Sequence, residues 1–312
     1  MSAKSAGPTG GRPRFRAAFA FMLATPAAPV WLRSPLSPSS YTALRRRPAR
    51  RECLSDMAAT QPRFDAIDAL RGAAMLWMTA YHFCFDLQHF GYTRQNFYED
   101  PFWTWQRTGI VSLFLLCAGA GQAIAVLQGQ SWPRFWRRWA QVAGCAALVS
   151  LGSWWMFPHS WISFGVLHGM ALMLLMVRWL LVRGWLRGAT PWVLGLGAVL
   201  AAPLLSALLQ SHGSPALGAA LQSRWWNWLG VVTEKPPTED WVPLLPWLGV
   251  MLWGAGAAQW WWQRRTSRAV RTPGSAERAL ALLGRWSLSY YMLHQPVLIG
   301  LLMAFRARSA AH

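Results

Sequence analysis

Charged residues are scarce in this sequence. Asp, Glu, Lys and Arg together make up 13% of the 312 residues, whereas a soluble domain usually carries about 25%. In their place stand long apolar runs of roughly 20 residues, the length that crosses the hydrocarbon core of a bilayer. The composition therefore excludes an ordinary soluble domain. It predicts an all-α integral membrane protein, a helix bundle that crosses the lipid bilayer several times.

Acidic residues are much rarer than basic ones. The chain has 11 Asp and Glu against 30 Lys and Arg, which gives a net charge of +19. A balance of this kind can indicate nucleic-acid binding. The arginines here lie between the apolar runs, where the positive-inside rule already explains them. We therefore expect no nucleic-acid partner.

Several cofactor motifs are missing. The four cysteines, Cys53, Cys84, Cys117 and Cys145, form no CxxC pair, so neither a zinc site nor a dithiol redox site is predicted. No Walker loop or GxGxxG loop occurs, which argues against ATP and NAD as ligands. We expect no bound metal.

Residues 1–62 differ from the rest of the chain. They are rich in Arg, Pro, Ser and Ala, and they show no hydrophobic periodicity. We expect a basic, disordered extension, followed by a membrane domain at 63–306. Two alternatives stay open for the extension. The run at 17–29 resembles a weak signal peptide, and a translation start at Met57 would remove most of the extension.

Seven apolar segments follow the extension. They lie near residues 66–88, 108–127, 139–157, 161–182, 191–210, 243–263 and 279–305. Arginines gather in alternate links, at 134–138, 183–187 and 264–278, whereas the intervening links carry few basic residues. By the positive-inside rule, this alternation predicts about seven transmembrane helices with a cytoplasmic N-terminus and an external C-terminus.

The longest external link spans residues 211–242 and ends in TEKPPTEDWVPLLPWLG. It is polar and rich in proline. One interpretation is a plain connector. The other is a loop that faces the substrate, since loops carry many functional residues. Under the second interpretation, Asp240 is a candidate site residue.

Ionisable residues share one face of the first segment, DALRGAAMLWMTAYHFCFD. A helix turns about 100° per residue, so with Arg71 at 0° His82 falls near 20°, and Asp68 and Asp86 both fall near 60°. His89 falls near 0° if the helix extends that far. The helical rise places His82 roughly 16 Å beyond Arg71. Ionisable groups within a span are costly and usually face a partner or a cavity.

Simpler explanations exist for each of these groups alone. Arg71 can reach the inner head groups, with Asp68 paired to it three residues back. His82 alone can be a satisfied buried histidine. Asp86 lies one turn from His82, where it is placed to orient the imidazole.

Two further histidines, His168 and His294, lie within later apolar segments. With His82 they make three intramembrane histidines on separate helices, and converging helices would bring them to one cavity. A helix–helix hydrogen bond explains each of them singly as well as catalysis does.

The first apolar segment matches the R-x10-H signature of membrane acyltransferases of the acyltransferase-3 type. Arg71 is its arginine and His82, after ten intervening residues, is its histidine. The chain more closely resembles bacterial proteins of the heparan-alpha-glucosaminide N-acetyltransferase catalytic-domain family. The stretches that carry this resemblance are FDAIDALRGAAMLWMTAYHFCFDL, IVSLFLLCAGAGQAIA, RFWRRWAQVAGCAALVSLGSWWMFPHSWISFGVLHGMAL, DWVPLLPWLGV and LGRWSLSYYMLHQP. Together they cover the whole predicted membrane domain.

The resemblance implies an acyltransferase that moves an acetyl group from cytoplasmic acetyl-CoA to an amino-sugar or glycan acceptor, in a bacterial inner membrane. It places Arg71 on the CoA side and His82 at the transfer centre. His89 is a rival, because lysosomal relatives place their histidine further into the first external loop. Histidine suits a general base near neutral pH, and a guanidinium suits a phosphate. Direct transfer and transfer through an acetyl-histidine both stay open.

Two other functions fit parts of the pattern. A transporter or channel-like protein of the same fold would use the polar face as a proton or solute path. A b-type haem protein would use two of His82, His168 and His294 as axial ligands.

Overall fold

The computed structural model describes residues 65–156, 158–238, 240–264 and 274–310. All of these residues belong to one unit, 59–312. The basic extension expected at 1–62, with Met57, lies outside the described residues.

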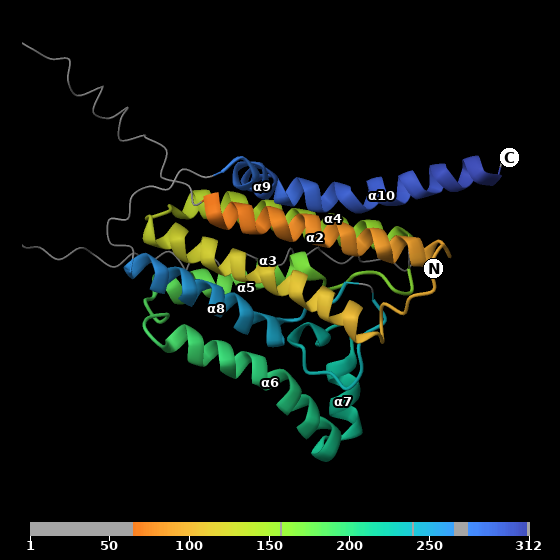
Figure 1. Cartoon of the computed structure of the whole chain (residues 1–312). Coiled ribbons are helices and arrows are strands. Elements are labelled where there is room, and N and C mark those ends of the chain that lie inside the picture. Colours follow the sequence, from red (N-terminus) through yellow and green to blue (C-terminus); the bar gives the residue numbers. More distant parts are fainter. Residues whose placement is uncertain (1–64, 157, 239, 265–273, 311–312) are drawn as a thin grey trace, which may run out of the picture. The chain divides into compact units, whose positions relative to one another are not determined.

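The described residues form helices and no strands (Figure 1). The elements in chain order are α2 (Asp65–His89), α3 (Pro101–Leu127), α4 (Trp132–Met156), α5 (Val166–Val182), α6 (Thr190–His212), α7 (Pro215–Gln222), the short 3-10 helix η2 (Asn227–Leu229), α8 (Leu244–Gln263), α9 (Ser275–Arg285) and α10 (Ser287–Ala310). Each predicted apolar segment falls on a helix. The last segment needs a correction, because the single span expected at 279–305 is two helices. The chain leaves the helical path at Trp286, with φ −94° and ψ 12°.

Three of the described helices are long and apolar enough to cross a membrane: α3, α6 and residues Ser287–Arg308 of α10. Their mean hydropathies are 2.2, 2.1 and 1.3. Helix α5 is also apolar but has only 17 residues. The all-helical architecture is therefore confirmed, whereas the count of about seven spans and the cytoplasmic N-terminus stay predictions.

Glycines let neighbouring helices approach backbone to backbone. A Cβ atom on Gly72 of α2 would overlap the carbonyl of Leu280 in α9, and one on Gly284 of α9 would overlap the carbonyl of Asp68. Helices α3 and α8 meet in the same way at Gly119. Helices in a membrane associate through such close packing, because lipid tails are as apolar as the side chains. The glycines therefore fix α2 against α9.

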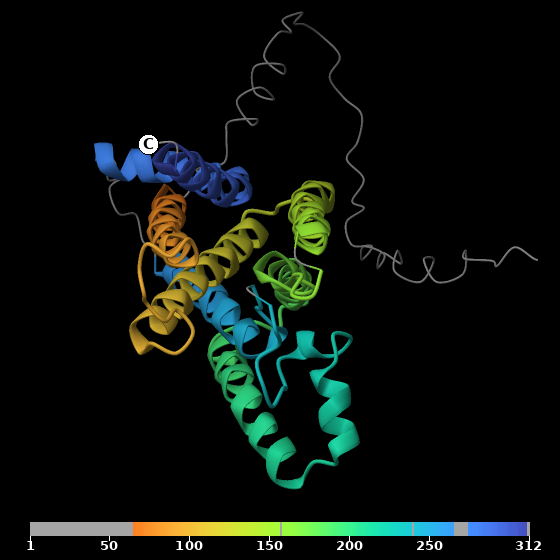
Figure 2. The same ribbon diagram turned by 90° about the vertical axis from the view of Figure 1, so that its right-hand side faces the viewer.

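Buried side chains form two clusters. One joins α3, α5 and α8 around Leu115, Met173 and Met251. The other joins Met75 of α2 to Phe114 of α3. In Figure 2, α10 and α2 lie side by side on one side of α3, and α4 and α5 lie on the other side. The polar face of α2 therefore has α9 and α10 as its neighbours.

Candidate active site

The charged residues at the start of α2 form an ion-pair cluster with α9. Arg71 donates to the carboxylate of Asp68 at 3.0 Å, three residues back along the same helix. Arg285 of α9 binds Asp65 at 2.7 Å and lies 3.8 Å from Asp68. The Arg71 side chain keeps 25% of its surface exposed. It is therefore held in place without being sealed from an incoming anion.

Farther along α2, His82 meets His294 of α10. The Nδ1 atom of His82 lies 2.7 Å from the Nε2 atom of His294. The two rings are stacked, with centroids 5.0 Å apart and an interplanar angle of 22°. His294 is buried and His82 is half-buried. Two histidines that are 212 residues apart in the chain therefore form one hydrogen-bonded pair.

The contacts of this pair determine which nitrogens carry protons. His294 Nδ1 lies 2.7 Å from the carbonyl oxygen of Tyr291, and a carbonyl only accepts, so this nitrogen is the donor. A neutral imidazole has one N–H, so His294 Nε2 accepts and His82 Nδ1 donates to it. The lone pair of the neutral His82 ring is therefore on Nε2, outside the pair. His82 is a base whose ring is oriented by a second group, as an activated catalytic base requires.

Asp86 lies one turn beyond His82 and is only 3% exposed. Its Oδ1 atom accepts a hydrogen bond from Gln295 Nε2 at 2.7 Å, so the group that contacts the His82 ring is His294 and not Asp86. Asp86 Oδ2 and Gln295 Oε1 are both buried and have no hydrogen-bond partner. Buried acceptors without donors are costly. An amine or hydroxyl ligand would supply the donors that these two oxygens lack.

Tyr290 continues the contact between α2 and α10. Thr79 donates to the carbonyl of Met75 at 2.8 Å. The hydroxyl of Tyr290 therefore donates to Thr79 Oγ1, at 2.7 Å. Tyr290, Tyr291 and Gln295 were not among the predicted site residues. Their signal is the stretch SLSYYMLHQP, in which they lie with His294 on one side of a helix.

Asp240 joins the loop before α8 to two helices. Its Oδ2 atom accepts from the backbone N–H of Val166, the first residue of α5, at 2.9 Å. The carboxylate also accepts the hydroxyl of Tyr291 on α10. Burial raises the pKa of the Asp240 carboxyl to about 6, and the two hydrogen bonds oppose this rise. His294 donates to the carbonyl of the same Tyr291. Tyr291 therefore links Asp240 to the histidine pair.

His168 of α5 lies in a different network. Ser150 donates to the carbonyl of Ile162 at 2.6 Å, so its oxygen accepts from His168 Nε2 at 3.0 Å. His168 Nδ1 then accepts from the backbone N–H of Gly165 at 3.3 Å. Both ring nitrogens are occupied at the start of α5, which fits a structural role. The structure thus brings together two of the three intramembrane histidines.

His89, the rival of His82, is the last residue of α2. It is exposed, and its ring contacts Phe90 edge-on. It lies about two turns beyond His82 and outside the pair.

The part of the chain that the structure describes holds no group of three or more His, Cys, Asp or Glu side chains placed to bind a metal ion. The histidine pair does not fit the axial positions of a haem. Two nitrogens on opposite sides of a metal, each at about 2.0 Å, stand about 4 Å apart. The 2.7 Å between His82 Nδ1 and His294 Nε2 is too short for an iron between them.

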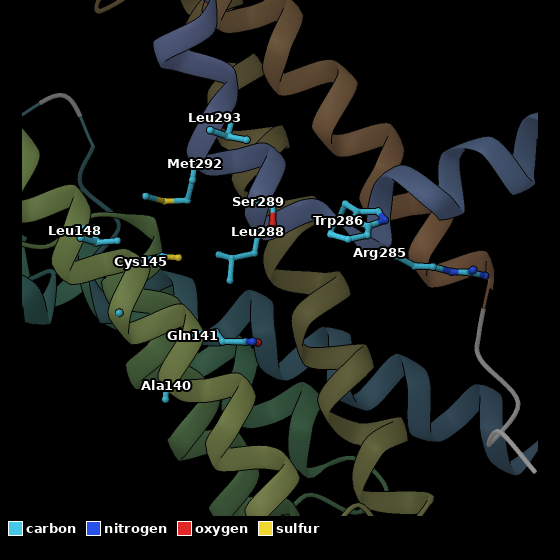
Figure 3. Close-up of a pocket in the computed structure, with 11 residues that line it drawn as sticks. Ala140, Gln141, Cys145, Leu148, Arg285, Trp286, Leu288, Ser289, Met292 and Leu293 are labelled. Carbon is cyan, nitrogen blue, oxygen red and sulfur yellow. The ribbon is translucent and has the colours of Figure 1, made fainter. Parts of the chain in front are cut away.

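Two cavities lie away from the pair. The larger, of about 580 Å³, is an open cleft between α4 and α10 (Figure 3). Gln141 and Cys145 line it from α4, and Ser289 and Met292 line it from α10. Ser289 and Met292 lie roughly 140–160° around α10 from His294, so the helix itself separates the cleft from the pair. The smaller cavity, of about 260 Å³, lies beside η2.

Residues 63–296 match the family model described as "Heparan-alpha-glucosaminide N-acetyltransferase, catalytic". The matched range runs from the start of α2 into α10, so it contains Arg71, Asp240 and both histidines of the pair. No curated protein and no solved structure matches the chain.

Proposed function

The chain belongs to the heparan-alpha-glucosaminide N-acetyltransferase catalytic-domain family, which makes it a membrane acetyltransferase, and from this premise we propose that it transfers an acetyl group from acetyl-CoA to an amino-sugar or glycan acceptor. His82 is the general base of the proposed reaction, and His294 positions it. Arg71 binds the donor. The proposed location is a bacterial inner membrane.

The observation that carries this proposal is the hydrogen-bonded pair of His82 and His294. His82 Nε2 takes the proton of the acceptor amine or hydroxyl while that nitrogen or oxygen attacks the thioester carbonyl. The carbon–sulfur bond breaks, and the proton passes from His82 to the departing CoA thiolate. The cation that forms briefly on His82 keeps its Nδ1–H bond to His294 Nε2, so the ring does not have to reorient.

The neighbouring oxygens favour direct attack by a bound acceptor. Asp86 Oδ2, one turn from His82, and Gln295 Oε1, on the residue after His294, are buried acceptors without donors. A primary amine has two N–H groups, so it can donate one to these oxygens and the other to His82 Nε2 while it presents its lone pair to the thioester. An acceptor held in this way reacts without a covalent acetyl-histidine.

The donor is proposed to approach from the Arg71 end of α2. Arg71 precedes His82 on an unbroken helix by roughly 16 Å of helical rise, a length on the scale of an extended pantetheine arm. Exposed arginines stand at the start of α4, at Arg134, Arg137 and Arg138. Positive charge at this end attracts an anionic nucleotide.

The test uses the full chain in lipid nanodiscs, supplied with acetyl-CoA and either glucosamine or galactosamine. We expect release of free CoA thiol that depends on the sugar, together with an acetylated sugar detected by mass spectrometry. Folded protein that releases no thiol, while proteoliposomes that contain it take up solute, would replace this proposal with the transporter hypothesis.

A further inference from the structure

The smaller cavity lies where the turn before α5 meets the end of α7 and η2. Three segments form its wall: the turn before α5, the residues around η2 and the proline-rich stretch at 236–238. Its volume of about 260 Å³ is below the 300–1,000 Å³ that is typical of drug-sized ligands. The space is therefore large enough for only one small unit, of the size of a single six-membered ring.

Asn227 supplies a buried polar group to this cavity. The residue lines the cavity and is only 2% exposed, yet its Oδ1 atom has no hydrogen-bond partner. A buried amide oxygen normally has a donor, because leaving it unpaired costs free energy on folding. The missing partner has to be a donor, which means an O–H group of a water molecule or an O–H or N–H group of a ligand.

Trp161 and Arg224 form a second, flat part of the wall. The guanidinium of Arg224 lies 5.1 Å from the centroid of the Trp161 ring, and its Nη2 donates to the carbonyl of His159 at 3.1 Å. An aromatic ring provides apolar surface for the C–H face of a sugar, and a guanidinium provides donors for its oxygens. Ser163 and Thr238 add hydroxyls to the lining.

The loop that leads into the proline-rich part of the wall is held at residues 233–234 before any ligand binds. Gln222 Nε2 donates to the carbonyl of Glu234 at 2.6 Å. Gln222 Oε1 accepts from the backbone N–H groups of Thr233 and Glu234, both at 3.3 Å. A loop that is already bonded to a neighbouring helix needs little further ordering when a ligand binds.

A series of hydrogen bonds links the wall of the cavity to the histidine pair. Thr238 lies two residues before Asp240, so the two are at most about 7 Å apart along the chain. Asp240 bonds Tyr291, and the Tyr291 carbonyl bonds His294. From the other wall, Ser163 lies three residues before Val166, which also bonds Asp240. A unit bound in the cavity therefore lies beside the loop that contacts the proposed transfer centre.

We propose that this cavity is a sugar subsite. It holds one polyhydroxylated ring of the acceptor, with a hydroxyl or N–H group of the ring donating to Asn227 Oδ1 and the ring stacked along Trp161 and Arg224. This inference rests on the proposed function for the statement that the sugar is an acceptor. The binding itself needs no donor and no transfer.

The test measures sugar binding alone, by saturation-transfer NMR with the full chain in nanodiscs free of sugar-based detergent. Glucosamine and N-acetylglucosamine are the probes, and glycerol is the non-sugar reference. We expect saturation of the sugar ring protons by the wild type, and binding weakened about ten-fold or more in Asn227→Leu, the loss typical of one buried hydrogen bond. The matched control is Gln210→Leu, which replaces an exposed amide on α6 and should bind as the wild type does.

Asn227→Leu can fail to fold, so Trp161→Ala and Ser163→Ala test the same cavity from its other wall. Equal binding by the wild type and by every folded cavity variant contradicts the proposal, as does the absence of sugar binding by the wild type. His82→Ala separates this outcome from failure of the proposed function, since it should keep sugar binding while losing transfer. Sugar binding without any acetyl transfer would overturn the function and leave the subsite standing.

Discussion

His82 of α2 and His294 of α10 face each other across a helix interface, with His82 Nδ1 2.7 Å from His294 Nε2. The Nδ1 atom of His294 donates to the Tyr291 carbonyl at 2.7 Å. His294 Nε2 therefore accepts a hydrogen bond from His82 Nδ1. The reactive lone pair is thereby assigned to His82 Nε2.

His294 acts through His82. Removing the ring nitrogen of His294 should therefore lower the rate of transfer and leave the affinity for the donor nearly unchanged. We expect His294→Phe to lower kcat about 100-fold, within the range for loss of a general base, and to leave the KM for acetyl-CoA within about two-fold. His294→Gln keeps a hydrogen-bond acceptor and should recover part of the rate. Steady-state kinetics of the two variants against the wild type check this, and equal kcat values for Phe and Gln would contradict it.

Arg71 is assigned to the donor. Loss of a charged hydrogen bond costs about 1.5–3 kcal/mol, so Arg71→Ala should raise the KM or Kd for acetyl-CoA by about 10- to 100-fold. Calorimetric titration of acetyl-CoA measures the effect. Arg306→Ala, which removes an exposed arginine near the end of α10, is the control and should bind the donor normally. Unchanged donor affinity in Arg71→Ala would remove Arg71 from the donor site.

Asp240 makes stability depend on pH. Its folded pKa of about 6 lies above the ordinary value of 3.8, because burial favours the neutral acid. The folded state therefore binds more protons than the unfolded state between these values, and stability should fall as pH rises from about 4 to about 6. Asp240→Asn does not titrate and should lack this part of the decline. Thermal unfolding of both proteins between pH 4 and pH 7 tests the sign, and parallel curves would contradict it.

The contact of α2 with α9 depends on glycine. Gly72→Ala places a Cβ atom against the Leu280 carbonyl, and overpacking of this kind costs about 1–3 kcal/mol. Gly300→Ala on α10 is the matched control, because a Cβ there meets nothing within 4 Å. We expect a lower Tm for the first variant and an unchanged or higher Tm for the second. The same Tm for both would argue against close packing of α2 and α9.

The sequence predicted the polar face of α2 well, because helical periodicity depends only on neighbours along the chain. Asp68 and Arg71, three residues apart, pair as their spacing indicates. The break at Trp286 was missed, since the apolar pattern continues across it. The break separates α9, which packs against the charged start of α2, from α10, which carries His294.

The partners of the α2 face were less accessible to sequence reasoning. His82 meets His294 across 212 residues, and Gln295 meets Asp86 across 209. Which histidine pairs with which depends on helix packing, so His168 looked equivalent to His294 until the structure placed it against Ser150. Asp240 was a candidate only because it lies in the long external link. Its hydrogen bond to Tyr291 could not be predicted without knowing how the helices pack.

The most direct test of the account compares single-turnover acetyl transfer in His82→Ala and His89→Ala, each in nanodiscs and each shown to bind acetyl-CoA. The account predicts that His82→Ala loses transfer by about 100-fold or more, and that His89→Ala, which lies exposed at the end of α2, keeps the wild-type rate. Loss of transfer in His89→Ala with full activity in His82→Ala would contradict it and move the transfer centre to the end of the helix.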